Sequence, residues 1–136
     1  MRILGVDYGT KRIGLAIGEI EVKMAFAKKV IPSTGNPRKD AQNVARYCKE
    51  EECDSIVIGL PVFARGEEGE QARITREFGE ELRKMGFTVE YWNERYTSLA
   101  AEDKLAHLKP KRRKEVADSE AARIMLMDYM SSLEQA

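Results

Sequence analysis

Three carboxylates, Asp7, Glu94 and Asp118, are the side chains that we expect to carry the chemistry of this sequence. Carboxylates brought together repel one another, and hard divalent cations such as Mg²⁺ or Mn²⁺ relieve that repulsion. A ligand set made only of oxygen selects these cations over zinc. The single histidine, His107, argues against a zinc site and against a catalytic dyad that needs histidine.

Asp7 belongs to an apolar run over residues 2 to 8 that predicts a β-strand. Because side chains alternate between the two faces of a strand, Asp7 shares the face of Ile3 and Gly5, which should be covered rather than solvated. An unpaired charge on a covered face is unfavourable, so Asp7 needs a cation or strong hydrogen-bond donors. Turn chemistry is the alternative, with the backbone amides of residues 8 to 11 as the donors.

Asp118 falls on the apolar stripe of a helix predicted over residues 116 to 133. The stripe continues through Ala122, Met125 and Tyr129, which follow at helical spacing. Small residues at 121 and 122 would let this end of the helix approach a sheet closely. The alternative is that Asp118 only caps the helix or favours its dipole from the first turn.

Glu94 directly follows a strand predicted over residues 87 to 92. A surface ion pair with Arg95 is the alternative explanation for this acid. The functional interpretation depends on topology: if the strands that contain Asp7 and precede Glu94 run parallel, both acids lie at carboxyl ends. That edge is where α/β sheets bind ligands.

The remaining elements complete an α/β pattern. Three strands joined as hairpins come first, followed by helices and strands in alternation, and this order predicts a mixed five-stranded sheet with helices on both faces. We expect strands over residues 2–8, 12–18, 22–31, 55–59 and 87–92, and helices over 38–52, 69–85, from Thr97 or Ser98 towards 107, and over 116–133.

Bulk composition fits one globular domain spanning residues 1 to 136. Hydrophobic residues make up 43% of the chain and charged residues 34%. The apolar start meets Asp7 too early for a signal peptide, and no apolar run has membrane-spanning length, so we expect a cytoplasmic protein. Cys48 and Cys53 are too few for a disulfide framework.

Overall charge does not favour nucleic-acid binding, because 23 basic residues balance 23 acidic ones. A basic run from Lys109 to Lys114 stands immediately before Asp118. Such a run is commonly a solvated loop, and it becomes a candidate for phosphate contact only beside an active site.

Four motifs that span nearly the whole chain carry a family resemblance. They are Gly5-Val6-Asp7-Tyr8-Gly9-Thr10-Lys11-Arg12-Ile13-Gly14-Leu15-Ala16, Ile58-Gly59-Leu60-Pro61, Asn93-Glu94-Arg95-Tyr96-Thr97-Ser98 and Asp118-Ser119-Glu120-Ala121-Ala122. In these motifs and their order the chain resembles the YqgF/RuvX family of pre-16S ribosomal RNA nucleases, which are related to Holliday junction resolvases. The family usually has aspartate at the position of Asn93 and leucine at that of Tyr96.

The resemblance implies an RNase H-like fold in which Asp7, Glu94 and Asp118 are the catalytic metal ligands. The implied reaction is hydrolysis of a phosphodiester in RNA or DNA with two Mg²⁺ or Mn²⁺ ions. The implied substrates are precursor ribosomal RNA, processed at the 5' end of pre-16S, or branched DNA. Our candidates for substrate contact are Lys11, Arg12 and Arg95, for which ordinary turn charge is the alternative. The sequence leaves the oligomeric state open, a homodimer included.

Two other functions compete with a nuclease. The opening hairpin also resembles the phosphate loop of the actin and sugar-kinase group, which suggests ATP-dependent phosphotransfer. Those enzymes close two related lobes over nucleotide, and this chain has the length of one. A catalytically silent nucleic-acid-binding or regulatory module is the other alternative, although it would have no need of an acid on a buried helical stripe.

Overall fold

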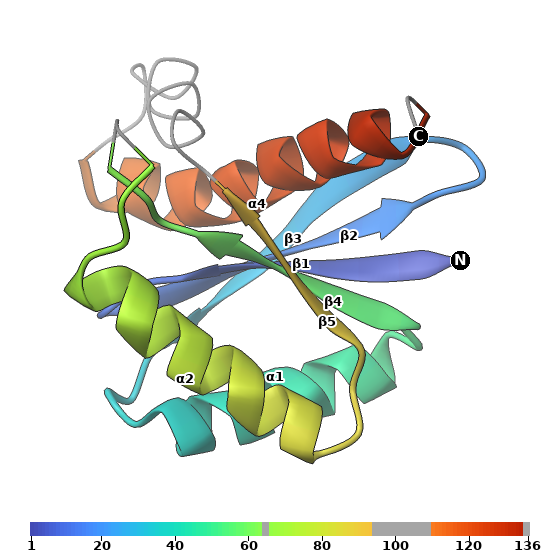
Figure 1. Cartoon of the computed structure of the whole chain (residues 1–136). Coiled ribbons are helices and arrows are strands. Elements are labelled where there is room, and N and C mark those ends of the chain that lie inside the picture. Colours follow the sequence, from blue (N-terminus) through green and yellow to red (C-terminus); the bar gives the residue numbers. More distant parts are fainter. Residues whose placement is uncertain (64–65, 94–109, 135–136) are drawn as a thin grey trace.

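The computed structural model describes residues 1–63, 66–93 and 110–134, with residues 110–116 and 134 as helical backbone (Figure 1). Glu94, Arg95, the helix expected from Thr97 or Ser98, and the side chains of the basic run lie outside this description. The elements are β1 (Arg2–Tyr8), β2 (Arg12–Glu19), β3 (Met24–Pro32), α1 (Pro37–Glu50), β4 (Ser55–Leu60), α2 (Glu70–Lys84), β5 (Val89–Asn93) and α4 (Pro110–Glu134).

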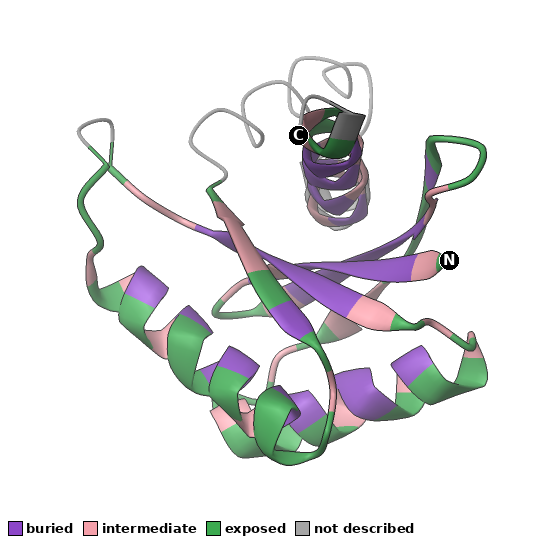
Figure 2. Ribbon diagram, turned by 45° about the vertical axis from the view of Figure 1, so that its right-hand side comes forward, coloured by how far each residue is buried: buried purple, intermediate pink, exposed green. Residues whose placement is uncertain are grey.

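The five strands form one mixed sheet in the order β3-β2-β1-β4-β5. β1, β2 and β3 pair as antiparallel hairpins, whereas β4 runs parallel to both β1 and β5. Figure 2 shows α4 against one face of the sheet and α1 and α2 against the other. The predicted mixed five-stranded sheet with helices on both faces is therefore confirmed.

Local signals explain where two helices start or stop. The side chain of Asn36 accepts hydrogen bonds from the amides of Arg38 and Lys39, and Pro37 occupies the first position of α1. At the end of α2, Gly86 has a φ of +97°, and the amide of Phe87 donates to the carbonyl of Leu82. This closure of α2 takes up residue 87, so β5 begins at Val89 and not at the predicted residue 87.

The last helix begins earlier than predicted. α4 starts at Pro110, whereas the sequence pattern predicted a start at residue 116. Proline suits the first position of a helix, and the lysines and arginines that follow it favour helix, so the basic run extends α4. Asp118 consequently lies about two turns inside the helix, which excludes its role as an N-cap.

The two faces of the sheet pack against the helices with different side chains. On the side of α1 and α2 the strands present large residues, including Leu4, Val6, Ile13, Leu15, Ile56 and Ile58, which pack around Phe78 and Leu82. On the side of α4 the central strands present Gly5, Gly14, Ala16 and Gly18. Because these residues are small, α4 can pack closely against the sheet at these positions.

Among the described residues, no helix has the combination of length and apolar character that would let it cross a membrane.

Candidate functional site

Asp7 lies near the carboxyl end of β1, on the face of the sheet covered by α4. Ile3 packs in the cluster formed with α4, and a Cβ atom placed on Gly5 would lie 2.5 Å from the Cγ atom of Leu126. Side chains alternate along the strand, so Asp7 continues this face and is half-buried. The predicted placement of Asp7 on a covered face is confirmed.

Gly14 connects Asp7 with the last helix. In the antiparallel pair of β1 and β2, Gly14 lies directly opposite Asp7, so both belong to one face of the sheet. A Cβ atom on Gly14 would lie only 2.0 Å from the backbone oxygen of Asp118. Only glycine permits this contact between α4 and β2, and the contact places the Asp118 backbone against the β2 position that lies opposite Asp7.

Asp118 is also paired with a cation. The Nε atom of Arg12 donates a hydrogen bond of 2.6 Å to the Oδ2 atom of Asp118. The Asp118 side chain is 26% exposed and that of Arg12 is 35% exposed, so this ion pair is partly shielded from water. Burial raises the pKa of Asp118, and the hydrogen bond and charge of Arg12 oppose that rise without cancelling it.

The stripe of α4 predicted from the sequence is confirmed. Ala122 and Met125 are fully buried and Tyr129 is nearly so, while Asp118 at the start of the stripe remains half-buried. A carboxylate at the N-terminal end of this apolar stripe is unfavourable unless it is paired or binds a ligand. This position distinguishes Asp118 from the exposed acids of the same chain.

On the face of the sheet covered by α1 and α2, a buried polar network holds the end of β1. The hydroxyl of Tyr8 donates to the fully buried carboxylate of Asp40 at 2.6 Å, and its ring stacks on Phe78 with 4.1 Å between the centroids. Asp40 also accepts hydrogen bonds from the side chains of Ser33 and Thr34 and from the Thr34 amide. The network fixes the residue that follows Asp7.

Sequence reasoning missed Asp40. Its position in the first turn of α1 is typical of an exposed acid that interacts with the helix dipole. The only sequence signal for its burial is the preceding pair Ser33-Thr34, and hydroxyls in a loop have many possible partners.

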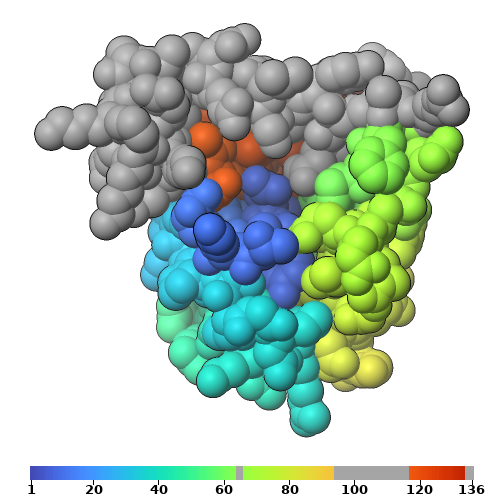
Figure 3. Space-filling model, turned by 90° about the vertical axis from the view of Figure 1, so that its left-hand side faces the viewer, coloured from blue at the N-terminus to red at the C-terminus, as the bar shows by residue number. Residues whose placement is uncertain are grey.

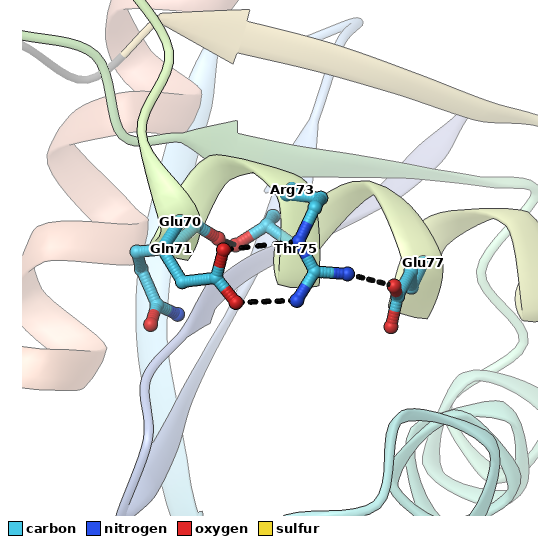
Figure 4. A network of polar contacts seen from close by, with 5 residues as sticks. All are labelled: Glu70, Gln71, Arg73, Thr75 and Glu77. Atoms are coloured by element: carbon cyan, nitrogen blue, oxygen red, sulfur yellow. Dashed lines mark hydrogen bonds and ion pairs between the residues drawn. The ribbon is translucent and has the colours of Figure 1, made fainter.

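The first turns of α2 support the same end of β1. The side-chain amide of Gln71 donates to the backbone oxygen of Tyr8 at 3.1 Å. Figure 4 shows Gln71 near Thr75, whose hydroxyl donates to the Gln71 backbone oxygen at 2.7 Å, and Arg73 between Glu70 and Glu77. The ion pairs of Arg73 are exposed and add little stability, whereas the Gln71 contact connects α2 to β1.

Lys11, one of the predicted substrate contacts, lies in the turn between β1 and β2. Figure 3 shows the start of the described α4 side chains (orange) reaching the surface beside the turn between β1 and β2 (blue). Lys11 is exposed in this turn, and its backbone oxygen accepts a hydrogen bond from the amide of Ser33 at the end of β3. Lys11 thus directly precedes Arg12, whose side chain contacts Asp118.

Glu94 and Arg95 follow the last described residue of β5. Asn93 pairs with Leu60 at the carboxyl ends of the parallel strands β5 and β4, the edge at which β1 also ends. The topological part of the Glu94 prediction, parallel strands with a common carboxyl edge, is therefore confirmed. The position of the Glu94 carboxylate stays a prediction.

The described acids fit a hard divalent cation. Asp7 and Asp118 offer carboxylate oxygens on one half-buried surface, and this is the ligand chemistry that Mg²⁺ and Mn²⁺ prefer. Within residues 1–63, 66–93 and 110–134, no cluster of three or more potential metal ligands is found. Glu94, the third ligand predicted from the sequence, lies outside these residues.

Sequence comparison places the chain in a family. The model of the RuvX family, described as Holliday junction resolvase, matches residues 1–132. The chain belongs to the RuvX family. One relative, "Putative pre-16S rRNA nuclease" of Chloroflexus aggregans, is 41% identical over 133 residues, which cover 96% of this chain and 93% of the relative. A protein of the same name from Sulfurihydrogenibium is 38% identical and covers 97% of this chain and 91% of that protein.

Structural comparison agrees with this family. RuvC of T. thermophilus, solved in complex with a Holliday junction substrate, matches with a TM-score of 0.63 over 100% of this chain and 97% of the RuvC chain. At 15% sequence identity the match concerns the fold alone. The RNase H-like fold expected for a RuvX family member is thus confirmed.

Proposed function

We propose that this RuvX family member is a metal-dependent nuclease that hydrolyses phosphodiester bonds in nucleic acid. The observation that carries the proposal is the contact across Gly14, which brings a helical carboxylate, Asp118, beside the strand carboxylate Asp7. The family match over nearly the whole chain supports the same activity.

In this mechanism Asp7, Glu94 and Asp118 hold the divalent ions, Mg²⁺ or Mn²⁺. Such ions, when bound, lower the pKa of an attacking water and stabilise the leaving oxyanion. The chain itself contributes the fixed positions of the carboxylates, since Asp40 and Gln71 hold the end of β1 through their hydrogen bonds with Tyr8. Lys11, Arg12 and Arg95 contact phosphate groups of the substrate.

The preferred substrate is the precursor of 16S ribosomal RNA, cleaved near its 5' end in the cytoplasm. The names of the relatives at 38 to 41% identity support this choice. Branched DNA is the second candidate, because the fold matches that of a RuvC solved with a Holliday junction. The half-buried position of Asp118 on the apolar stripe favours either nuclease over a catalytically silent binding module, and a homodimer stays a prediction.

The test is cleavage of precursor ribosomal RNA and of a four-way DNA junction with Mg²⁺, Mn²⁺ or a chelator. We expect Asp7→Asn to reduce metal-dependent cleavage by about 100-fold or more, because a ligand of the ions is lost. Asp128→Asn is the matched control, since Asp128 lies on the same helix as Asp118 and is exposed. Equal cleavage by wild type and Asp7→Asn would refute the proposed site, and cleavage of the junction alone would favour DNA as substrate.

A further inference from the structure

We propose that Arg12 is a resident counter-ion that holds Asp118 until a divalent cation binds, and that Arg12 then releases this carboxylate and contacts a substrate phosphate. The inference rests on the proposed function and adds the order in which one arginine serves two partners. A divalent cation that binds Asp118 must then displace Arg12, which already occupies this carboxylate in the metal-free protein.

The geometry of the pair supports this role. The Nε atom of Arg12 lies 2.6 Å from Oδ2 of Asp118, so the arginine occupies one of the two oxygens that this carboxylate can offer to a metal. A divalent cation on the same carboxylate would share it with a full positive charge, and like charges at this separation repel strongly in a partly buried site. Arg12 and the cation are therefore competitors for Asp118.

The backbone of Arg12 is fixed while its side chain can move. Arg12 begins β2, pairs with Pro32 of β3, and accepts a hydrogen bond of 2.9 Å from the Gly9 amide to its backbone oxygen. Its place in β2 is on the same face as Gly14, two residues later, so its side chain starts from the face of Asp118. The Arg12 side chain is 35% exposed, which leaves it a path towards solvent and substrate.

The neighbouring Lys11 does not have these properties. Lys11 lies in the turn, is exposed, and carries a compact charge at the end of a flexible stem. Arginine, in contrast, has a planar group whose nitrogens suit both a carboxylate and the oxygens of a phosphate. One side chain can thus neutralise Asp118 in the metal-free protein and bind nucleic acid in the loaded one.

The pairing also explains how the site exists without a cation. Half-buried Asp118 would otherwise carry its negative charge with reduced hydration. Arg12 offsets this cost, and the offset is lost when the arginine is replaced. The same replacement removes the competitor of the metal, so stability and metal affinity should change in opposite directions.

The experiment measures Mn²⁺ binding by calorimetry in the absence of nucleic acid, for wild type, Arg12→Gln and Arg12→Lys. We expect Arg12→Gln to bind Mn²⁺ about 5- to 10-fold more tightly than wild type and to melt at a lower temperature in chelator. Arg12→Lys keeps the charge and should bind Mn²⁺ with nearly the wild-type affinity. Arg46→Gln, which removes an exposed positive charge on α1, is the matched control, with an unchanged Mn²⁺ affinity.

Two outcomes would overturn the inference in different ways. Equal or weaker Mn²⁺ binding by Arg12→Gln, with binding by wild type intact, would show that Arg12 does not compete for Asp118 and would leave the nuclease proposal standing. Absence of Mn²⁺ binding by wild type would overturn the proposed metal site itself. Loss of nucleic-acid affinity in Arg12→Gln, measured separately by a rise in KM, would support the second half of the role.

Discussion

The two faces of the sheet are built from different residues. The face under α1 and α2 mainly stabilises the fold, whereas the face under α4 sets the geometry of the site. The face under α1 and α2 is filled by large aliphatic and aromatic side chains around Phe78. The face under α4 has glycines where the central strands meet the helix, so that backbone approaches backbone at Gly14. Large side chains bury more apolar area, whereas small ones allow precise placement of Asp118.

The strongest test of this comparison is Gly14→Ala. The new Cβ atom would lie 2.0 Å from the backbone oxygen of Asp118, and neither backbone can move without displacing α4. We expect a loss of about 3 kcal/mol in the free energy of unfolding and a loss of cleavage of about 100-fold in protein that still folds. Denaturant unfolding and cleavage of precursor RNA measure the two effects.

Gly18→Ala is the matched control on the same strand and face. There the added Cβ would lie 3.3 Å from the flexible end of Met130, which can adjust. The variant should lose less than about 1 kcal/mol and keep its activity. Similar losses for both glycines would contradict the special role of Gly14.

Leu82→Ala tests the other face. Leu82 is fully buried between α2 and the sheet, so its truncation should lower the free energy of unfolding by about 3 kcal/mol. Because Leu82 is remote from the edge with Asp7, the folded fraction should retain cleavage within a few-fold of wild type. A loss of activity much larger than the unfolded fraction would mean that both faces set the site geometry.

Asp40→Asn tests a buried charge on the α1 and α2 face. The change weakens four hydrogen bonds to a carboxylate, from Tyr8, Ser33 and Thr34, and should cost about 2 kcal/mol. Asp54→Asn is a suitable control, because Asp54 is exposed and accepts from the Arg2 amide. Equal melting temperatures for the two variants would show that the Asp40 network adds no stability.

The smallest effect is expected for Asp118→Asn in chelator. Burial raises the folded-state pKa of Asp118 above its unfolded value, so its contribution to stability is fully present below the unfolded pKa and is lost as pH rises through the folded one. At neutral pH the charge is therefore a cost, and the variant should melt at the same temperature as wild type or slightly higher.

That small difference should shrink as the pH falls below about 4, where wild-type Asp118 becomes increasingly protonated in both states. Thermal unfolding followed from pH 3.5 to 8 in chelator measures it. A clear fall in melting temperature at neutral pH would mean that the ion pair with Arg12 outweighs the cost of burial.

The sequence predicted the elements and the face of each acid because both follow from local periodicity. Alternation along residues 2 to 8 placed Asp7, and the helical stripe placed Asp118. The contact between Arg12 and Asp118 could not be predicted, because it joins residues 106 positions apart and depends on how closely α4 packs. Gly14 was visible as part of a family motif, but its contact with a helix backbone was not.

The pairing of β1 and β2 with α4 joins the beginning of the chain to its end. During synthesis Asp7 and Arg12 emerge from the ribosome well before Asp118, which follows Arg12 by 106 residues. A ribosome-bound chain that has made the whole sheet still lacks Asp118 beside Asp7. The proposed nuclease site is therefore incomplete until α4 has packed on the sheet.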